Sequence, residues 1–126
     1  MITGMPLFER TSFLEIWVDG RKYDYDITLH VDGRITRRRK ELSKPFADGH
    51  TPVAPPELEE LLNECPEIIV IGNGQAGAMP VPEETRKLAT EKGVELIVVR
   101  TPEALDILNR LLREGRRVAA ILHITC

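Results

Sequence analysis

The second half of the chain alternates between short apolar runs and helical segments, and this alternation limits the possible folds more than any other feature. The apolar runs of strand length lie at residues 67–71, 94–99 and 116–126. The segments with apolar residues at helical spacing lie at 57–65, 82–92 and 103–114. The last apolar run is apolar on both faces, as expected of a central strand. This alternation predicts a βαβαβ unit with parallel strands and right-handed crossovers.

The first third of the chain has the two-residue period of β-strands instead. In YDYDITLHV (23–31) aromatic and aliphatic residues alternate with polar ones, which predicts a strand with one solvated face. Asp-Gly pairs at 19–20 and 32–33 separate this run from LEIWV (14–18) and RITRR (34–38). Asp-Gly between alternating segments favours tight hairpins. We therefore predict a three-stranded antiparallel meander.

Length and composition are those of one globular domain. The 126 residues are 42% hydrophobic and 29% charged. We divide this domain into an antiparallel β meander (1–43), a proline-rich loop (44–56) and an αβαβαβ portion (57–126). One Gln and three Asn beside abundant Glu, Lys and Arg resemble the composition of thermophilic proteins.

Charge and cysteine content exclude several functions. The net charge of −3 provides no basic field for nucleic acid or a membrane surface. No apolar run is long enough to span a bilayer, and the first residues lack the layout of a secretory signal. The two cysteines, Cys65 and Cys126, make no disulfide framework. These features predict a soluble cytoplasmic protein that binds neither nucleic acid nor membranes.

The glycine-rich stretch IGNGQAG (71–77) follows a predicted strand with the G-x-G-x-x-G spacing of dinucleotide-binding loops. Such a loop needs its helix to begin within the motif, so that backbone N–H groups face the pyrophosphate. Here Pro80 and Pro82 prevent a continuous helix from Gly74 onward. The next strand also ends in Arg100 rather than in the acidic residue that binds ribose. We therefore predict a strand-to-helix connection, a helix that begins within two residues of Pro82, and no nicotinamide or flavin cofactor.

Histidine, cysteine and basic residues elsewhere favour structural interpretations over functional ones. His123 and Cys126 are three apart on a predicted strand and face opposite sides, so we expect no shared metal ion. Cys65 lies on the apolar side of its helix and is expected in the core. The basic run at 37–40 is expected to be a solvated edge strand rather than a nucleic-acid site.

Three polar residues, Asp24, Asp26 and His30, share one face of the predicted strand 23–31. Neighbours on that face are too far apart to chelate an ion without a third partner, so we expect a solvated face. The sequence contains no catalytic Ser-His-Asp order, no activated-cysteine context and no metal-ligand spacing. We therefore predict neither catalytic residues nor a bound metal.

Asn109 lies at the margin of the apolar stripe of the helix at 103–114, where helix propensity does not favour Asn. Two interpretations remain open, a structural hydrogen bond to neighbouring backbone and a contact with a ligand. Thr101, followed by Pro102, is predicted to cap the N-terminus of this helix.

Residues 68–126 carry an ordered series of motifs. They are Gly72-Asn73-Gly74 after an apolar strand, Val81-Pro82, KGVELIV (92–98), T-x-x-A (101–104), Asn109, a small-residue strand (118–122) and H-x-T-C (123–126). The series resembles the Mth-like family that includes the adipogenesis-associated Mth-domain-containing protein and an assembly factor of mitochondrial respiratory complex I. The resemblance implies a three-layer α/β fold with a mixed central sheet. Its members are described as assembly or regulatory factors without established catalytic residues, which implies a protein partner.

Ligands of open α/β sheets bind at the carboxyl ends of the strands, so a binding site is expected at that rim. The candidate ligand-binding residues are Asn73, Gly74, Gly77 and Thr101, with the loop of His50 as a roof and Asn109 as a further candidate. Two function classes remain open. One is a non-enzymatic interaction, assembly or regulatory module, and the other is a small-molecule or anion-binding enzyme that uses the glycine loop. The sequence does not set the oligomeric state.

Overall fold

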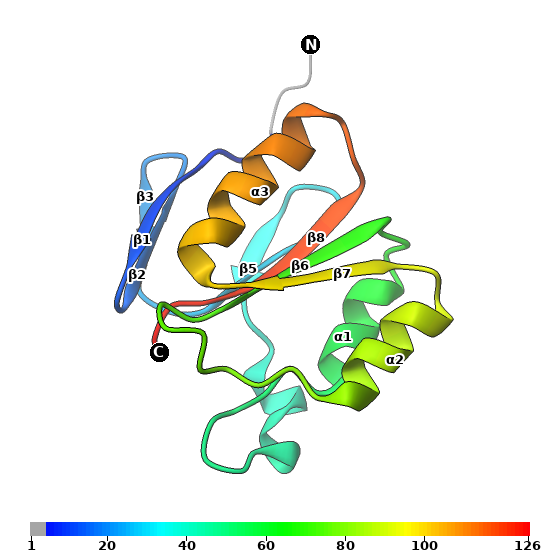
Figure 1. Ribbon diagram of the computed structural model, residues 1–126. Coiled ribbons are helices and arrows are strands. Elements are labelled where there is room, and N and C mark those ends of the chain that lie inside the picture. The colour runs from blue at the N-terminus through cyan, green and yellow to red at the C-terminus, as the bar shows by residue number, and fades with distance from the viewer. Residues whose placement is uncertain (1–4) are drawn as a thin grey trace.

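The computed structural model describes residues 5–126, which form two β-sheets and three α-helices (Figure 1). A small antiparallel sheet has the order β1-β2-β3, with β1 at Phe8–Ser12, β2 at Glu15–Val18 and β3 at Arg21–Tyr23. The larger sheet has the order β5-β4-β8-β6-β7. Its strands are β4 (Ile27–Leu29), β5 (Ile35–Arg37), β6 (Ile68–Asn73), β7 (Glu95–Val99) and β8 (Val118–His123). Strand β6 pairs in parallel with β7 and β8, whereas β4 pairs antiparallel with β5 and β8, so the larger sheet is mixed.

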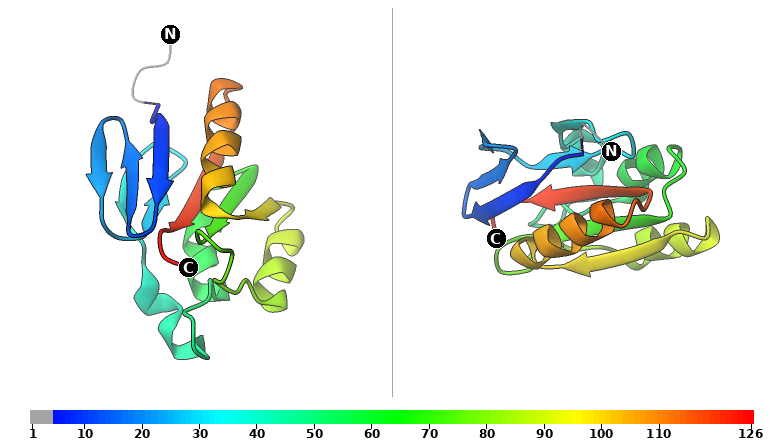
Figure 2. Two further views of the ribbon diagram at one scale, coloured as in Figure 1. Left: turned by 60° about the vertical axis from the view of Figure 1, so that its left-hand side comes forward. Right: turned by 90° about the horizontal axis from the view of Figure 1, so that it is seen from above.

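Helices cover both faces of the larger sheet. Helices α1 (Pro55–Leu62) and α2 (Glu83–Glu91) lie on one face, and α3 (Thr101–Arg113) lies on the other, beside the small sheet (Figures 1 and 2). Two short 3₁₀ turns, Lys40–Leu42 and Lys44–Phe46, connect β5 to the proline-rich loop. The predicted three-layer α/β fold with a mixed sheet is confirmed. No helix among residues 5–126 is long and apolar enough to cross a membrane.

The alternation of side chains along the central strands builds one core on each face of the sheet. In β6, Ile68 and Val70 pack in the cluster that contains α3 and the small sheet, while Ile69 and Ile71 pack in the cluster that contains α1 and α2. All six residues of β8 are buried. The predictions of a central last strand and of parallel pairing in this half are therefore confirmed.

The amino-terminal third differs from its prediction. Both Asp-Gly hairpins form, joining β2 to β3 and β4 to β5. The run at 23–31, however, is not one strand, because the chain crosses from the small sheet to the larger one between β3 and β4. Strand β1 was not predicted, since its burial pattern lacks a two-residue period and its register shifts between Phe8 and Arg10. Local periodicity thus gave both hairpin pairs correctly, whereas the single three-stranded meander was wrong, because the two pairs lie in different sheets.

Asn109 joins α3 to the first strand through both groups of its side-chain amide. Its Oδ1 accepts the N–H of Phe8 (3.0 Å), and its Nδ2 donates to the carbonyl of Phe8 (2.7 Å). These two bonds satisfy backbone groups at an edge of the small sheet that no strand among residues 5–126 covers. The structural interpretation of Asn109 is confirmed.

We expect Asn109→Ala to lower the free energy of unfolding by ~1–3 kcal/mol, because both backbone groups of Phe8 would lose their partner. Urea denaturation of the variant and the parent measures this difference. The matched control is Asp106→Ala, an exposed position on the same helix, which should change stability little. Equal effects of the two substitutions would contradict the assigned role.

Candidate functional site

The glycine loop after β6 is wrapped around the residues that follow β8. The N–H of Gln75 donates to the carbonyl of Thr125 (2.8 Å), and the N–H groups of Ala76 and Ala78 donate to the backbone oxygen of Cys126 (3.0 and 2.9 Å). A phosphate bound at this loop would need the same N–H groups as hydrogen-bond donors. Helix α2 begins at Glu83, within two residues of Pro82 as predicted. The loop is therefore a strand-to-helix connection that binds its own chain.

Gly74 allows this close approach. Its φ is +110°, and a Cβ at this position would overlap the backbone carbon and oxygen of Cys126. Any side chain would displace the segment that the loop holds. The glycine is therefore required by backbone packing, which explains it without a nucleotide.

Thr101 and Asn73 complete the inner side of this rim. The hydroxyl of Thr101 donates to the carbonyl of His123 (2.6 Å) and accepts the N–H of Gly74 (2.9 Å). Thr101 is thus the first residue of α3, and it connects the ends of β6, β7 and β8. The residue that caps the N-terminus of α3 is Arg100, so the predicted capping role of Thr101 was wrong. Asn73 Oδ1 is buried and has no hydrogen-bond partner among residues 5–126.

The predicted rim residues come together only in part. Asn73, Gly74, Gly77 and Thr101 are neighbours, since a Cβ on Gly77 would lie 3.5 Å from Asn73 Oδ1 and Gly74 bonds to Thr101. His50 is exposed and forms an isolated bridge with Asp48, and no hydrogen bond described for residues 5–126 joins it to the glycine loop. Asn109 bonds to Phe8 instead. Ligand binding by these residues stays a prediction.

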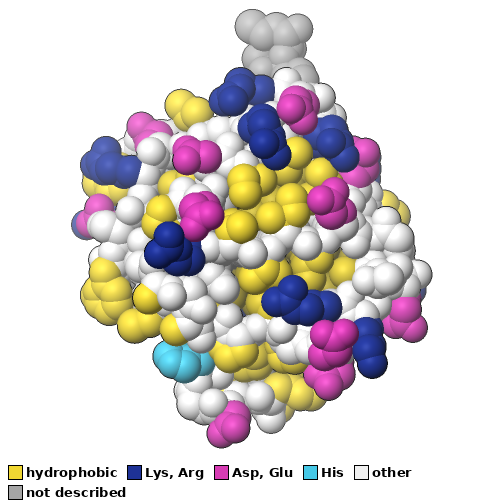
Figure 3. Space-filling model, viewed as in Figure 1, with side chains coloured by type: hydrophobic (Ala, Val, Ile, Leu, Met, Phe, Trp, Pro, Cys, Tyr) yellow, Lys and Arg dark blue, Asp and Glu magenta, His cyan; other side chains and the backbone are white. Residues whose placement is uncertain are grey.

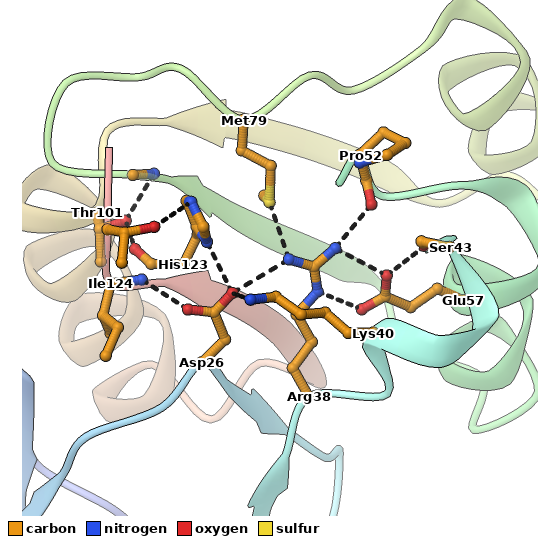
Figure 4. A network of polar contacts seen from close by, with 12 residues as sticks. Asp26, Arg38, Lys40, Ser43, Pro52, Glu57, Met79, Thr101, His123 and Ile124 are labelled. Carbon is orange, nitrogen blue, oxygen red and sulfur yellow. Dashed lines mark hydrogen bonds and ion pairs between the residues drawn. The ribbon is translucent and has the colours of Figure 1, made fainter. Parts of the chain in front are cut away.

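A buried ion network adjoins the rim and is centred on Arg38 (Figure 4). Its guanidinium forms two hydrogen bonds with Glu57 (2.8 and 3.1 Å), one with Asp26 (3.1 Å) and one with the carbonyl of Pro52 (2.7 Å). Ser43 donates to Glu57 and accepts the N–H of Ala54. Arg38 is only 4% exposed. This network attaches the proline-rich loop and α1 to the end of β5.

Asp26 links that network to the end of β8. Its Oδ2 accepts from His123 Nδ1 (2.7 Å) as well as from Arg38, and its Oδ1 accepts the N–H of Ile124 (2.9 Å). Burial acts to raise the pKa of Asp26, but the bond and charge of His123, the Ile124 amide and the Lys40 ammonium lower it to about 2. Burial acts to lower the pKa of Arg38, whereas Glu57 and Asp26 raise it. Both groups are therefore charged at neutral pH.

His123 continues the chain of hydrogen bonds toward the surface. Its Nε2 lies 2.9 Å from Thr125 Oγ1, on the opposite side of the ring from Asp26. A carboxylate, an imidazole and a hydroxyl thus lie in one line, and Asp26 orients the ring. Asp26 cannot donate a proton at neutral pH, because its pKa keeps it ionised.

A cavity of about 390 Å³ opens beside this line. Asp26, Thr125 and Lys40 contribute polar walls, and Leu14 and Ile124 contribute apolar ones. The cavity is within the usual size range of small-molecule sites, which is about 300–1,000 Å³. Its lining includes Ile124 and Thr125, which follow β8, but no residue of the glycine loop and not Thr101, so it is a separate opening from the predicted rim site.

Several sequence interpretations are corrected here. Asp26 was expected on a solvated face and Arg38 in a solvated edge strand, yet both are buried. His30 bonds to Glu64 (2.6 Å) and Thr36 (2.8 Å) instead of facing solvent beside Asp26. Cys65 is exposed with φ of +58°, because α1 ends at Leu62 and the helical spacing does not extend to it.

The two edges of the larger sheet differ in character. Edge strand β5 has three residues and is flanked by arginines, whereas edge strand β7 has five residues and is apolar after Glu95. The N–H of Glu95 donates to the carbonyl of Glu67 (3.1 Å), so the strand alternation directs the N–H groups of Leu96 and Val98 away from β6. Figure 3 shows hydrophobic side chains gathered over α3 and along β7.

A mixed sheet with helices on both faces, and a glycine loop bonded to Thr125 and Cys126, define a small three-layer α/β domain. Comparison of the chain with known proteins shows its family. A family model described as a protein of unknown function (DUF498/DUF598) matches residues 8–123, and the chain belongs to this family. The solved structure titled MT938 is 40% identical, with a TM-score of 0.82 and coverage of 96% of this chain and 99% of that one. Hypothetical protein PH1505 from Pyrococcus horikoshii OT3 is 36% identical, with a TM-score of 0.84 and coverage of 94% and 98%.

A more distant relative shows the fold alone. A protein from Bordetella pertussis, described as a Mth938-like domain, is 18% identical, with a TM-score of 0.62 and coverage of 98% of this chain and 89% of that one. The predicted Mth-like domain is thus confirmed at the level of family and fold. None of these descriptions states an activity.

We expect Gly74→Ala to lower the free energy of unfolding by about 3 kcal/mol or more, because its Cβ would overlap the backbone of Cys126. Gly93→Ala is the matched control. Gly93 also has a positive φ (+70°), but a Cβ there would contact nothing within 4 Å, so only the backbone strain of about 1 kcal/mol remains. Chemical denaturation of both variants separates the two contributions, and equal losses would contradict the role given to Gly74.

We expect the acid sensitivity of the fold to depend on Asp26. Its folded pKa of about 2 lies below the ordinary value of 3.8, so its contribution of ~2 kcal/mol is present above pH ~4 and is lost as the pH falls toward 2. Asp26→Asn should be less stable than the parent at pH 7, and the difference should narrow between pH 4 and 2. Urea midpoints across that range measure it. A difference that is constant with pH, or matched by exposed Asp106→Asn, would contradict the assignment.

Proposed function

We propose that this protein is an interaction module of the assembly or regulatory kind, and that it binds an extended segment of a partner protein at the free edge of β7. The observation that carries the proposal is the apolar edge strand, whose outward N–H groups at Leu96 and Val98 have no partner strand among residues 5–126. An added strand would pair with these groups, because peptides bind to exposed sheet edges through main-chain hydrogen bonds. Binding of this kind requires no catalytic residue.

Side chains on both sides of β7 fit an added strand with alternating apolar residues. Ile97 and Val99 lie on the α3 side and are only partly buried, and Leu96 and Val98 are partly buried on the α2 side. Soluble proteins usually protect such edges with charge, proline or a bulge. Strand β7 has no Lys, Arg or Pro between Glu95 and Val99. An edge without these protections favours association.

The resemblance to a family whose members are described as assembly or regulatory factors supports the same class. The alternative, an anion-binding enzyme that uses the glycine loop, has less support, because the amides at Gln75, Ala76 and Ala78 are bonded to Thr125 and Cys126. An anion at that loop would first have to displace this segment.

The proposal is tested by removing the outward N–H of Val98 in β7 and measuring peptide binding. Peptides enriched from a random library displayed on phage provide the probe, and their affinity is measured by titration calorimetry. We expect Val98→Pro to lower affinity by about 10-fold or more, because proline removes one outward N–H and cannot accept a neighbouring strand. In the parent, bound peptide should shift the amide NMR signals of Leu96 and Val98.

Val98→Thr is the matched control, since it keeps the N–H and the β-branched shape and should retain binding. Equal binding by Val98→Pro and the parent, with both folded, would refute the proposed edge. Analytical ultracentrifugation tests whether the parent associates with itself. Self-association that Val98→Pro abolishes would show that the strand bound at β7 comes from a second copy of the chain and not from a separate partner.

A further inference from the structure

Three functional groups from opposite ends of the sequence lie in a hydrogen-bonded line that the proposed function does not use. Thr125 Oγ1 lies 2.9 Å from His123 Nε2, and His123 Nδ1 lies 2.7 Å from Asp26 Oδ2. Nucleophilic catalysis by a hydroxyl requires this order of groups, in which a base contacts the hydroxyl and a third group orients the base. The line lies apart from β7, so it goes beyond the proposed function.

The charges around Asp26 fix the roles of the two ring nitrogens. Asp26 is ionised and only accepts, so His123 Nδ1 carries the hydrogen of that bond, and in the tautomer that has this single hydrogen Nε2 accepts the Thr125 proton. Arg38 also contacts Asp26, but its charge is already matched by two hydrogen bonds with Glu57. Asp26 stays hydrogen-bonded to Nδ1 and stabilises the imidazolium that forms when His123 takes the Thr125 proton.

Thr125 is accessible from the cavity beside this line. The residue is half-buried and contributes to the cavity wall with Leu14, Tyr25, Lys40 and Ile124. Leu14 occupies the tip between β1 and β2 with φ of +71°, a strained conformation for a branched side chain, and its N–H donates to the carbonyl of Ile124 (2.9 Å). Strained residues cluster at functional sites. The hydrogen bond to Ile124 holds this apolar residue at the cavity despite the strain.

We propose that Thr125 is an activated nucleophile for acyl transfer from small carboxylic esters or thioesters with a short apolar acyl chain. Thr125 and His123 are the catalytic residues, and Asp26 is a positioning residue. The exposed side chain of Leu14 contacts the acyl chain, and the Lys40 ammonium, 3.6 Å from Asp26 Oδ2, supplies positive charge at the same wall.

The reaction has two balanced steps. Thr125 Oγ1 attacks the carbonyl carbon and forms a C–O bond while its proton moves to His123 Nε2. The bond to the leaving alkoxide or thiolate breaks, and that group departs with the proton from His123. Water, with His123 as its base, then cleaves the threonine ester, releasing the carboxylic acid and restoring the Thr125 hydroxyl.

The probe is p-nitrophenyl acetate, used with the full chain carrying Cys65→Ser and Cys126→Ser so that its exposed thiols cannot react. We expect release of p-nitrophenolate and an acetyl group on Thr125, located by peptide mass spectrometry. Thr125→Ala should lower the rate of release by about 100-fold or more, in the range of a base-activated step. Thr125→Ser should retain release, because it keeps the hydroxyl.

Thr90→Ala removes an exposed hydroxyl on α2 and should leave the rate unchanged. His123→Gln should abolish release, and Asp26→Asn should lower kcat with KM unchanged, each compared per mole of folded protein. Acetylation confined to lysines, a Thr125→Ala rate equal to the parent rate, or no release above buffer would each overturn the proposal. None of these results bears on peptide binding at β7, so the two proposals fail separately.

Discussion

The carboxylate of Asp26 is the interaction on which the arrangement of this domain depends. It joins the crossing between the two sheets to the end of β8 through His123 and Ile124, and to the proline-rich loop through Arg38. Buried charges are costly unless they are paired and hydrogen-bonded, and here both oxygens of Asp26 have partners. The surrounding groups satisfy Arg38 and Glu57 as well. The network therefore joins the crossing between the sheets, the end of β8, α1 and the proline-rich loop, and it favours one arrangement of that loop.

The contact between the glycine loop and the residues after β8 follows from the hydrogen bond between Asp26 and Ile124. Because Asp26 holds Ile124, the next two residues run beneath the glycine loop, where the N–H groups of Gln75, Ala76 and Ala78 bind them. The conformation of Gly74 makes room for that segment, and Thr101 ties the same region to α3. A loop with the spacing of a nucleotide motif thus has a structural role, since its donors are used within the chain. Ile124 and Thr125 of this segment also line the cavity, so the Thr125 hydroxyl contacts the buried His123 at a wall of that cavity.

The parts of the fold that were predictable are those with local signals. Alternation of apolar runs and helical spacing gave the βαβαβ order, Asp-Gly pairs gave both hairpins, and Pro80 with Pro82 gave the start of α2. The site was not predictable in this way, because Asp26 and His123 are 97 residues apart and their contact depends on β4 pairing with β8. A two-residue period marks a strand face but does not say whether that face is solvated, so Asp26 and Arg38 were assigned to solvent. No local signal marked the two as a buried pair, because Asp26 lies in an alternating run and Arg38 in a basic one.

The positions of the two proposed activities follow from the same topology. The parallel part of the mixed sheet places the ends of β6, β7 and β8 at one rim, and the ordering β5-β4-β8-β6-β7 places β8 in the middle and β7 at the edge. Buried strand ends in the middle of a sheet can hold a fixed line of polar groups, because neighbouring strands and the Arg38 network restrict their motion. An edge strand cannot hold such a line, since one side of its backbone has no neighbouring strand. For the same reason it can pair with a strand from a partner. The proposed chemistry therefore lies at the end of β8 and the proposed partner binding at β7, so substitutions can test the two proposals separately.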